Sequence, residues 1–293
     1  MSRFVRVFRA GFLYPALFLF IVFIATPCVA DFRFAVIGDS RGHDDGINTE
    51  VLLEILKQIK SENVDFIVVV GDLITGSKHS GKHRDRLIKW KGIVEEFRIP
   101  VYISVGNHEI ESETSEDIVR SVFEMPDNGP SHLKELVYSF DQDNAHFVII
   151  DTDGYKNSHR LGNVQLEWLE DDLKKSGKEM KFVFGHKPAY PYKHHVRDSL
   201  DKYPAERDGL WDMFRQYKVA IYFCGHEHLY NSSMHEGVRQ VVTGGAGARF
   251  HDTPEEGGFY HFILVQVKDE GVCEVTVKDI EGEIKDHFKI GNN

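Results

Sequence analysis

Five short apolar runs divide the first 226 residues, and each ends in a glycine followed by a polar residue. Runs that are apolar at almost every position are typical of strands buried on both faces, as in parallel sheets covered by helices. The endings are Gly38-Asp39, Gly71-Asp72, Gly106-Asn107, Gly185-His186 and Gly225-His226. Because the carboxyl ends of parallel strands meet at one edge of a sheet, we expect these five polar side chains to gather there.

Two segments between these runs have the periodicity of core-facing helices. Residues 49–60 place four apolar side chains on one stripe, and residues 164–177 place three apolar side chains on another. The second segment ends in two lysines and Gly177, as is common at the C-terminus of a helix. The stripe residues are Leu52, Ile55, Leu56 and Ile59 in the first segment and Leu166, Leu169 and Leu173 in the second. Strands alternating with helices in this way indicate an α/β fold.

Antiparallel elements are predicted in the remaining sequence. Residues 137–154 have the pattern of a hairpin that turns near Asp143-Asn144, and residues 260–282 that of a hairpin that turns at residues 269–271. Residues 238–250 predict a further strand and a glycine-rich loop. The assembly we expect is a four-layer αββα sandwich, in which two mixed sheets pack face to face and helices flank them.

The N-terminus has the pattern of an export signal. Three arginines within the first nine residues precede an uncharged apolar stretch, and small residues follow before Asp31. We interpret residues 1–30 as a signal peptide and residues 31–293 as one domain, which predicts a periplasmic or secreted protein. The alternative is an uncleaved membrane anchor, since residues 10–30 are long enough to span a bilayer. Cleavage is favoured because a strand begins at Phe32 and leaves no linker.

Charge and cysteine content narrow the remaining possibilities. The chain has 293 residues, of which 46 are acidic and 35 basic, and its net charge is -11. This balance argues against a nucleic-acid partner, which requires a basic face to displace counterions from phosphates. Cys224 and Cys273 lie in apolar runs beyond the predicted signal, so we expect buried free thiols, with a single disulfide as the alternative.

The polar residues at the strand ends form a set suited to metal ions. His228 follows His226 by two residues, so in extended chain both imidazoles face the same side; a pair of surface histidines is the alternative for these two taken alone. The complete candidate set is Asp39, Asp72, Asn107, His186, His226 and His228. Oxygen and imidazole ligands without cysteine suit Mn, Fe, Zn or Mg. Six groups exceed one tetrahedral centre and fit two ions about 3.5–4 Å apart, an arrangement that serves phosphate ester hydrolysis.

The order of the motifs "GD", "GD", "GNHE", "GH" and "GHEH" from Phe32 onward resembles the calcineurin-like metallophosphoesterases, which include the purple acid phosphatases. This resemblance implies two divalent metal ions, with Mn²⁺ expected and Fe or Zn as alternatives. It implies that Asp39 and His228 bind the first ion, that Asp72 bridges both, and that Asn107, His186 and His226 bind the second. His108 would protonate the leaving oxygen, and Glu109 would orient the loop.

One position departs from the pattern of the family. Arg41 stands where most members have a histidine two residues after the first aspartate, and Thr75 stands where purple acid phosphatases have a tyrosine. His43 is an alternative ligand, although we interpret it as a polar loop residue. The first ion then either binds weakly, or Arg41 supplies charge beside the phosphate, as expected of a substrate-binding guanidinium.

The sequence therefore predicts an exported metal-dependent phosphoesterase that hydrolyses a phosphate mono- or diester through a metal-bridging hydroxide. The expected partner is a small phosphorylated substrate, and membrane contact is expected only if the N-terminal segment stays uncleaved. Residues 187–204 either overhang the site or form a solvated loop. The alternative function is a non-catalytic, metal-bearing interaction protein with a degenerate first metal site. His108, directly after Asn107, favours the enzyme.

Overall fold

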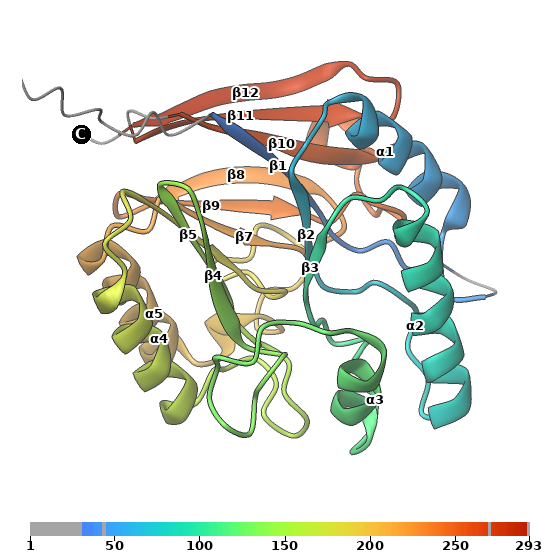
Figure 1. The fold of residues 1–293 in the computed structure, drawn as a ribbon, viewed down its shortest axis with the longest axis horizontal. Helices are drawn as coiled ribbons and strands as arrows, with labels where there is room; N and C mark the ends of the chain where they lie inside the picture. Colours follow the sequence, from blue (N-terminus) through green and yellow to red (C-terminus); the bar gives the residue numbers. More distant parts are fainter. Residues whose placement is uncertain (1–30, 43–44, 269–270, 292–293) are drawn as a thin grey trace, which may run out of the picture.

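The computed structural model describes residues 31–42, 45–268 and 271–291, which form two six-stranded sheets packed face to face (Figure 1). The first sheet has the order β12 (Ile284–Gly291), β11 (Val272–Asp279), β10 (His261–Lys268), β1 (Phe32–Ile37), β2 (Phe66–Val70), β3 (Val101–Ser104). The second has the order β4 (Tyr138–Gln142), β5 (Ala145–Ile149), β6 (Met180–Phe184), β7 (Ile221–Cys224), β9 (Val238–Thr243), β8 (Tyr230–His235).

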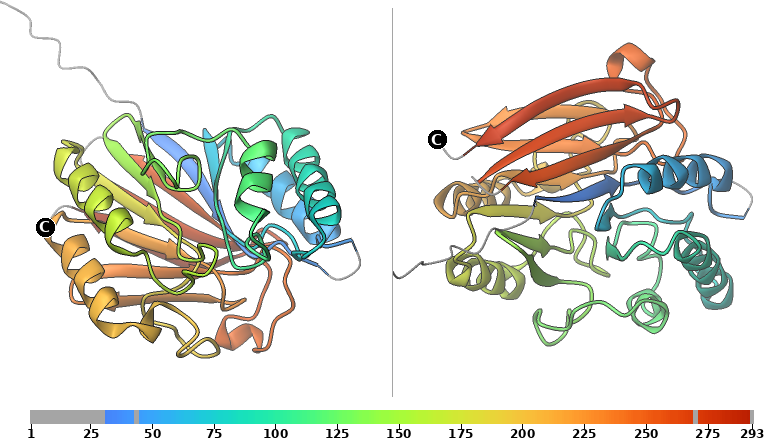
Figure 2. Two further views of the ribbon diagram at one scale, coloured as in Figure 1. Left: turned by 90° about the horizontal axis from the view of Figure 1, so that it is seen from below. Right: turned by 45° about the horizontal axis from the view of Figure 1, so that its top comes forward.

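Helices cover the outer face of each sheet. The first sheet is covered by α1 (Thr49–Ser61), α2 (Ser80–Glu95) and α3 (Ser115–Val122), and the second by α4 (Asn163–Lys175) and α5 (Pro204–Gln216). Two short 3-10 helices, η1 (Leu200–Lys202) and η2 (Pro254–Glu256), lie in loops. The views in Figure 2 show the same order of layers, so the predicted αββα sandwich is confirmed.

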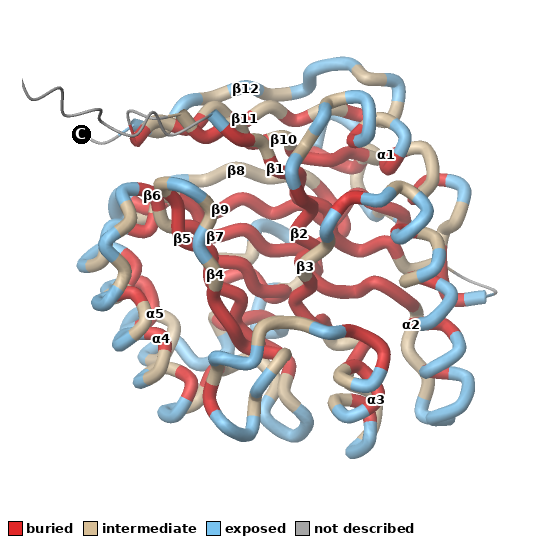
Figure 3. Tube along the Cα trace, viewed as in Figure 1, coloured by how far each residue is buried: buried red, intermediate tan, exposed pale blue. Residues whose placement is uncertain are grey.

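Both sheets are mixed, and their parallel parts contain the five apolar runs. β1, β2 and β3 pair in parallel, as do β5, β6, β7 and β9, whereas the outer strands pair antiparallel. The burial of most of these strands appears as red tube in Figure 3, whereas β3, at the edge of its sheet, begins half-buried. They are apolar on both faces because one face meets the other sheet and the other face meets helices.

The layer between the two sheets is rich in phenylalanine. Phe34 on β1 lies with its ring centroid 5.4 Å from that of Phe66 on β2 and 5.1 Å from that of Phe147 on β5. Phe184 on β6 stacks on Phe223 on β7, with centroids 5.3 Å apart. The strands that end in glycine and a polar residue are therefore anchored to one dry aromatic layer.

Both predicted hairpins are confirmed, since β4 pairs antiparallel with β5 and β10 with β11. The predicted helices are α1 and α4; in α4, Leu169 and Leu173 are buried and Leu166 is half-buried. Cys224 and Cys273 are buried free thiols, as expected.

The predicted signal peptide, residues 1–30, lies outside the described residues, and so does His43. Among the residues that are described, no helix is both long enough and apolar enough to cross a membrane.

Candidate metal centre

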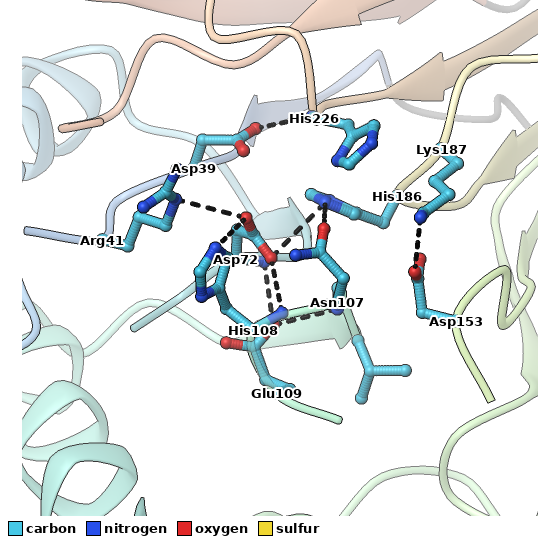
Figure 4. Close-up of polar contacts among 12 residues, drawn as sticks. Asp39, Arg41, Asp72, Asn107, His108, Glu109, Asp153, His186, Lys187 and His226 are labelled. Carbon is cyan, nitrogen blue, oxygen red and sulfur yellow. Dashed lines mark hydrogen bonds and ion pairs between the residues drawn. The ribbon is translucent and has the colours of Figure 1, made fainter. Parts of the chain in front are cut away.

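The six predicted ligand residues meet at the carboxyl ends of the strands, three from each sheet. Figure 4 shows five of them, Asp39, Asp72, Asn107, His186 and His226. Asp39, Asp72 and Asn107 follow β1, β2 and β3, whereas His186, His226 and His228 follow β6 and β7. His186 Nε2 lies 3.1 Å from Asn107 Oδ1 and 3.4 Å from Asp72 Oδ1. His228 Nε2 lies 3.5 Å from Asp39 Oδ1.

The backbone at these positions is strained. Four of the six residues have left-handed backbone conformations, with φ of 60° at Asp39, 52° at Asp72, 72° at His226 and 49° at His228. Such angles are uncommon for residues other than glycine and cluster at functional sites, where the surrounding structure imposes them. The strand-end glycines leave room for the ligands, because a Cβ at Gly225 would lie 2.3 Å from Asp39 Oδ2.

Each of the three imidazoles bonds to a backbone carbonyl through one ring nitrogen. Nδ1 of His186 bonds to the carbonyl of Val70 (2.8 Å) and Nε2 of His226 to that of Asp198 (3.0 Å). Nδ1 of His228 bonds to the carbonyl of Arg249 (3.1 Å). A nitrogen that donates to a carbonyl carries the proton, so Nδ1 of His226 and Nε2 of His228 keep a lone pair, whereas Nε2 of His186 faces Asn107 Oδ1 and Asp72 Oδ1. Histidine ligands of metals are oriented in this way.

The two carboxylates complete a donor set that fits divalent cations. Asp39 Oδ1 is buried and has no hydrogen-bond partner among the described residues, a costly state that a cation would relieve. Burial raises the pKa of Asp39 to about 7, against the effect of His186. Burial acts in the same direction on Asp72, but His186, His108 and Arg41 together hold the pKa of that carboxyl well below its usual range. One ligand atom each of Asp39, Asp72 and His228 lie within 4.8 Å of one another.

Glu109 holds the loop that carries Asn107. Its carboxylate accepts hydrogen bonds from the backbone nitrogens of Asp72 (2.8 Å), Gly106 (2.9 Å) and Ile74 (3.2 Å), and the side chain is fully buried. Burial raises the pKa of Glu109 to about 8, with the charge of Asp72 adding to the effect. Glu109 therefore orients the loop, as the sequence predicts.

His108 lies at the rim of the site. Its Nε2 is 3.9 Å from Asp72 Oδ2, and 23% of its side chain is exposed. Its backbone nitrogen donates to Asp72 Oδ1 at 3.1 Å, which fixes the loop against the ligand set. Burial lowers the pKa of His108, and the imidazole points toward the same space as the ligands (Figure 4).

The segment after His186 contacts the site at His226, which favours the overhanging interpretation, although several of its residues are exposed. The ring of His195 lies 3.9 Å from that of His226, and Asp198 accepts from His195 (3.1 Å) and from His159 (2.7 Å). Lys187 takes no part in this cover, because it is buried and paired with Asp153 at 3.1 Å.

Two residues of this region were not predicted from the sequence. Glu227, the middle residue of "GHEH", is buried and accepts from the backbone nitrogens of residues 192, 193 and 194, so it anchors the cover. Asp198 orients His226 through its carbonyl. The position of Glu227 between two histidines was a usable signal, whereas the contacts of Asp198 depend on the folded loop.

The family model of the calcineurin-like phosphoesterases matches residues 32–230. The chain belongs to the calcineurin-like phosphoesterases. Members of this family hydrolyse phosphoric esters with a dimetal centre, and the oxygen and imidazole donors described above accord with such a centre.

Curated relatives are acid phosphatases. Acid phosphatase type 7 of Mus musculus is 27% identical over an alignment of 281 positions that covers 84% of this chain and 61% of that protein. Tartrate-resistant acid phosphatase type 5 of Homo sapiens is 26% identical over 318 residues, covering 90% of this chain and 91% of that protein. Purple acid phosphatase 23 of Arabidopsis thaliana is 30% identical over 140 residues. This chain spans 29% of the Arabidopsis protein and 61% of the mouse protein.

Solved structures share the fold. Purple acid phosphatase PPD1 from yellow lupin (Lupinus luteus) superposes with a TM-score of 0.74 at 19% identity, covering 89% of this chain and 54% of that chain. A dimetal phosphatase from Danio rerio superposes with a TM-score of 0.64 at 15% identity, covering 89% of this chain and 99% of that chain.

Within this calcineurin-like phosphoesterase, Arg41 occupies the position between Asp72 and His228. Its Nε lies 3.4 Å from Asp72 Oδ2, and an Nη lies 3.1 Å from His228 Nε2. Thr75 does not supply a ligand in place of the family's tyrosine, because its hydroxyl donates to the carbonyl of Gly42.

Proposed function

We propose that this chain is an exported, metal-dependent phosphoesterase that hydrolyses a small phosphate mono- or diester. The observation that carries the proposal is the convergence of three carbonyl-oriented imidazoles with two buried carboxylates and one amide at a single sheet edge. The similarity to acid phosphatases over most of the chain supports the reaction class.

The donor atoms divide into two sets that share Asp72. Asp39, Asp72 and His228 form the first set. We assign Asp72, Asn107 and His186 to the second set, together with His226, whose ring centroid lies 5.0 Å from that of His186. We propose Mn²⁺ as the ion, because mixed carboxylate, amide and imidazole ligands suit it, with Fe or Zn as alternatives. When bound, such ions supply a water of lowered pKa and neutralise charge on the phosphoryl oxygens.

The chain's own residues perform the remaining steps. His108 is exposed enough to reach a leaving oxygen and gives it a proton from Nε2 as the ester bond breaks. Arg41 directs a guanidinium at the same space, with its Nε 3.4 Å from Asp72 Oδ2, and is the proposed donor to a phosphoryl oxygen. Residues 192–195 are anchored by Glu227 beside the site. We propose that they limit the size of the substrate that can enter, which favours small substrates.

We propose export, to a periplasmic or secreted location, from the N-terminal sequence pattern alone. Contact with a membrane is proposed only for the case in which residues 1–30 are not cleaved. The acid phosphatase relatives favour monoesters over diesters.

The test is hydrolysis by metal-stripped protein of p-nitrophenyl phosphate and bis-p-nitrophenyl phosphate, with added Mn²⁺, then Fe and Zn. We expect metal-dependent turnover, and a loss of about 10²–10⁴-fold in kcat for His108→Ala. His287→Ala, at an exposed position on β12, is the matched control and should retain full activity. If no metal gives turnover although the protein binds an ion, the proposal is wrong and a non-catalytic interaction protein is the better description.

A further inference from the structure

Arg41 lies where the first ion of a dimetal centre would bind. The residue follows Asp39 by two positions, and its backbone nitrogen donates to the carbonyl of Asp72 at 3.2 Å, which holds the start of the side chain beside the ligand set. From there the guanidinium contacts both Asp72 and His228, two of the three groups in the first donor set (Figure 4 shows the contact with Asp72).

The contact with His228 uses the atom that a metal ion would need. Nδ1 of His228 is committed to the carbonyl of Arg249, so Nε2 carries the only free lone pair of the ring. Arg41 Nη2 lies 3.1 Å from that nitrogen and donates to it. One lone pair cannot serve both a guanidinium N–H and a cation, so arginine and metal ion compete for His228.

Charge adds to this competition. An arginine keeps its proton at every ordinary pH, so a fixed positive charge faces Asp72 at 3.4 Å. The second donor set shares Asp72, but through Oδ1, which lies 3.4 Å from His186 Nε2. Lys187, the residue after His186, pairs with Asp153 at 3.1 Å (Figure 4). It also contacts Ser158.

We infer that Arg41 competes with the first metal ion for His228 and Asp72, so the chain binds one divalent ion tightly and a second at least tenfold more weakly. The tight site comprises Asp72, Asn107, His186 and His226. The inference rests on the metal site of the proposed function. It departs from the two equivalent ions that the family pattern predicts, because the guanidinium takes the position of one cation.

The experiment counts Mn²⁺ ions bound to the metal-stripped full chain, by isothermal titration calorimetry and by the loss of the free-ion EPR signal. We expect one tight ion in the wild-type protein and two ions of affinity within tenfold of each other in Arg41→Ala. Arg84→Ala is the matched control, because it removes the same charge from an exposed position on α2 and should still bind one tight ion. Arg41→Gln, a neutral side chain of similar reach, is a second variant in case Arg41→Ala does not fold, and should also bind two.

The outcomes separate this inference from the proposed function. Two tight ions in the wild-type protein would overturn the inference and leave the phosphoesterase proposal intact. A single tight ion in a folded Arg41 variant would also overturn it, since the guanidinium would then not be the cause. If the wild-type protein binds no ion at all, the proposed function fails first, and the inference falls with it.

Discussion

The carboxylate of Glu109 accepts a hydrogen bond of 2.8 Å from the backbone nitrogen of Asp72. Asp72, which follows β2, is therefore held by the loop that follows β3. The backbone nitrogens of Gly106 and Ile74 donate to the same buried carboxylate. Glu109→Ala would leave three buried donors without an acceptor, at roughly 1 kcal/mol or more each.

For Glu109→Ala we therefore expect a loss of about 3 kcal/mol in the free energy of unfolding, measured by urea denaturation. Metal affinity should fall about 10–100-fold, because the ligands lose the groups that orient them. Glu113→Ala, at an exposed position, is the control and should change neither quantity. Equal stability of the two variants would show that water replaces the lost acceptor.

Gly225→Ala should abolish binding of the weaker, first ion, because Asp39 belongs to the first donor set. A Cβ at this position would meet Asp39 Oδ2 at 2.3 Å, which displaces the carboxylate from the ligand set. Gly209→Ala is the matched control, because a Cβ there meets nothing within 4 Å on α5, and alanine should stabilise the helix by about 0.5–1 kcal/mol. Titration with Mn²⁺ measures the first effect and thermal denaturation the second. Unchanged affinity for the weaker ion in Gly225→Ala would contradict the proposed role of Asp39.

His261 should make the protein less stable in acid. The imidazole is fully buried, and burial lowers its pKa to about 4, against the bond from Nδ1 to the carbonyl of Phe259. In the unfolded chain the imidazole of His261 takes up a proton near pH 6.5, whereas in the folded chain it does so near pH 4. The free energy of unfolding therefore falls as pH falls through this window, by up to about 3 kcal/mol. Urea denaturation at pH 7 and pH 4.5 measures the change. We expect His261→Gln to lose less stability over this range; an identical loss in both proteins would refute the assignment.

His146 should have the opposite effect. Its imidazole bonds to Asp141 at 2.7 Å and to Asp172 at 2.8 Å, and although burial acts against the charged form, these two carboxylates raise its pKa above the ordinary value. The stabilisation is fully present below about pH 6.5 and is lost as pH rises through the raised pKa. Comparing the unfolding of wild type and His146→Gln at pH 6 and pH 9, we expect the difference in stability to shrink at the higher pH. A constant difference would mean that the pairing does not depend on the charge of His146.

The parts of the fold that the sequence predicted are those whose burial is uniform. Strands such as β2 are covered on both faces and become continuous apolar runs, so their ends, and the residues placed there, could be located in advance. β8 and β12 were missed because they lie at sheet edges and are largely polar or exposed. The helix α2 was missed because its apolar positions form no clear stripe in the sequence.

The candidate site divides in the same way. Asp72 and His186 were predictable because a strand end fixes where the backbone places them. The position of the Arg41 guanidinium was not, since a long side chain has many rotamers and the contacts of the folded site select one. Asp198 was missed because it meets His226 only through the tertiary path of its loop.

The division of the ligands between the two sheets has a consequence for the whole molecule. Asp39, Asp72 and Asn107 follow strands of the first sheet and the three histidines follow strands of the second, and a layer of apolar side chains lies between the two sheets. An ion bound at this edge would tie the two sheets together as a crosslink does, at the point where their strands end in polar residues. The free energy of metal binding then adds to the stability of the fold. Loss of the metal would therefore weaken the contact between the two sheets and also abolish the reaction at their edge.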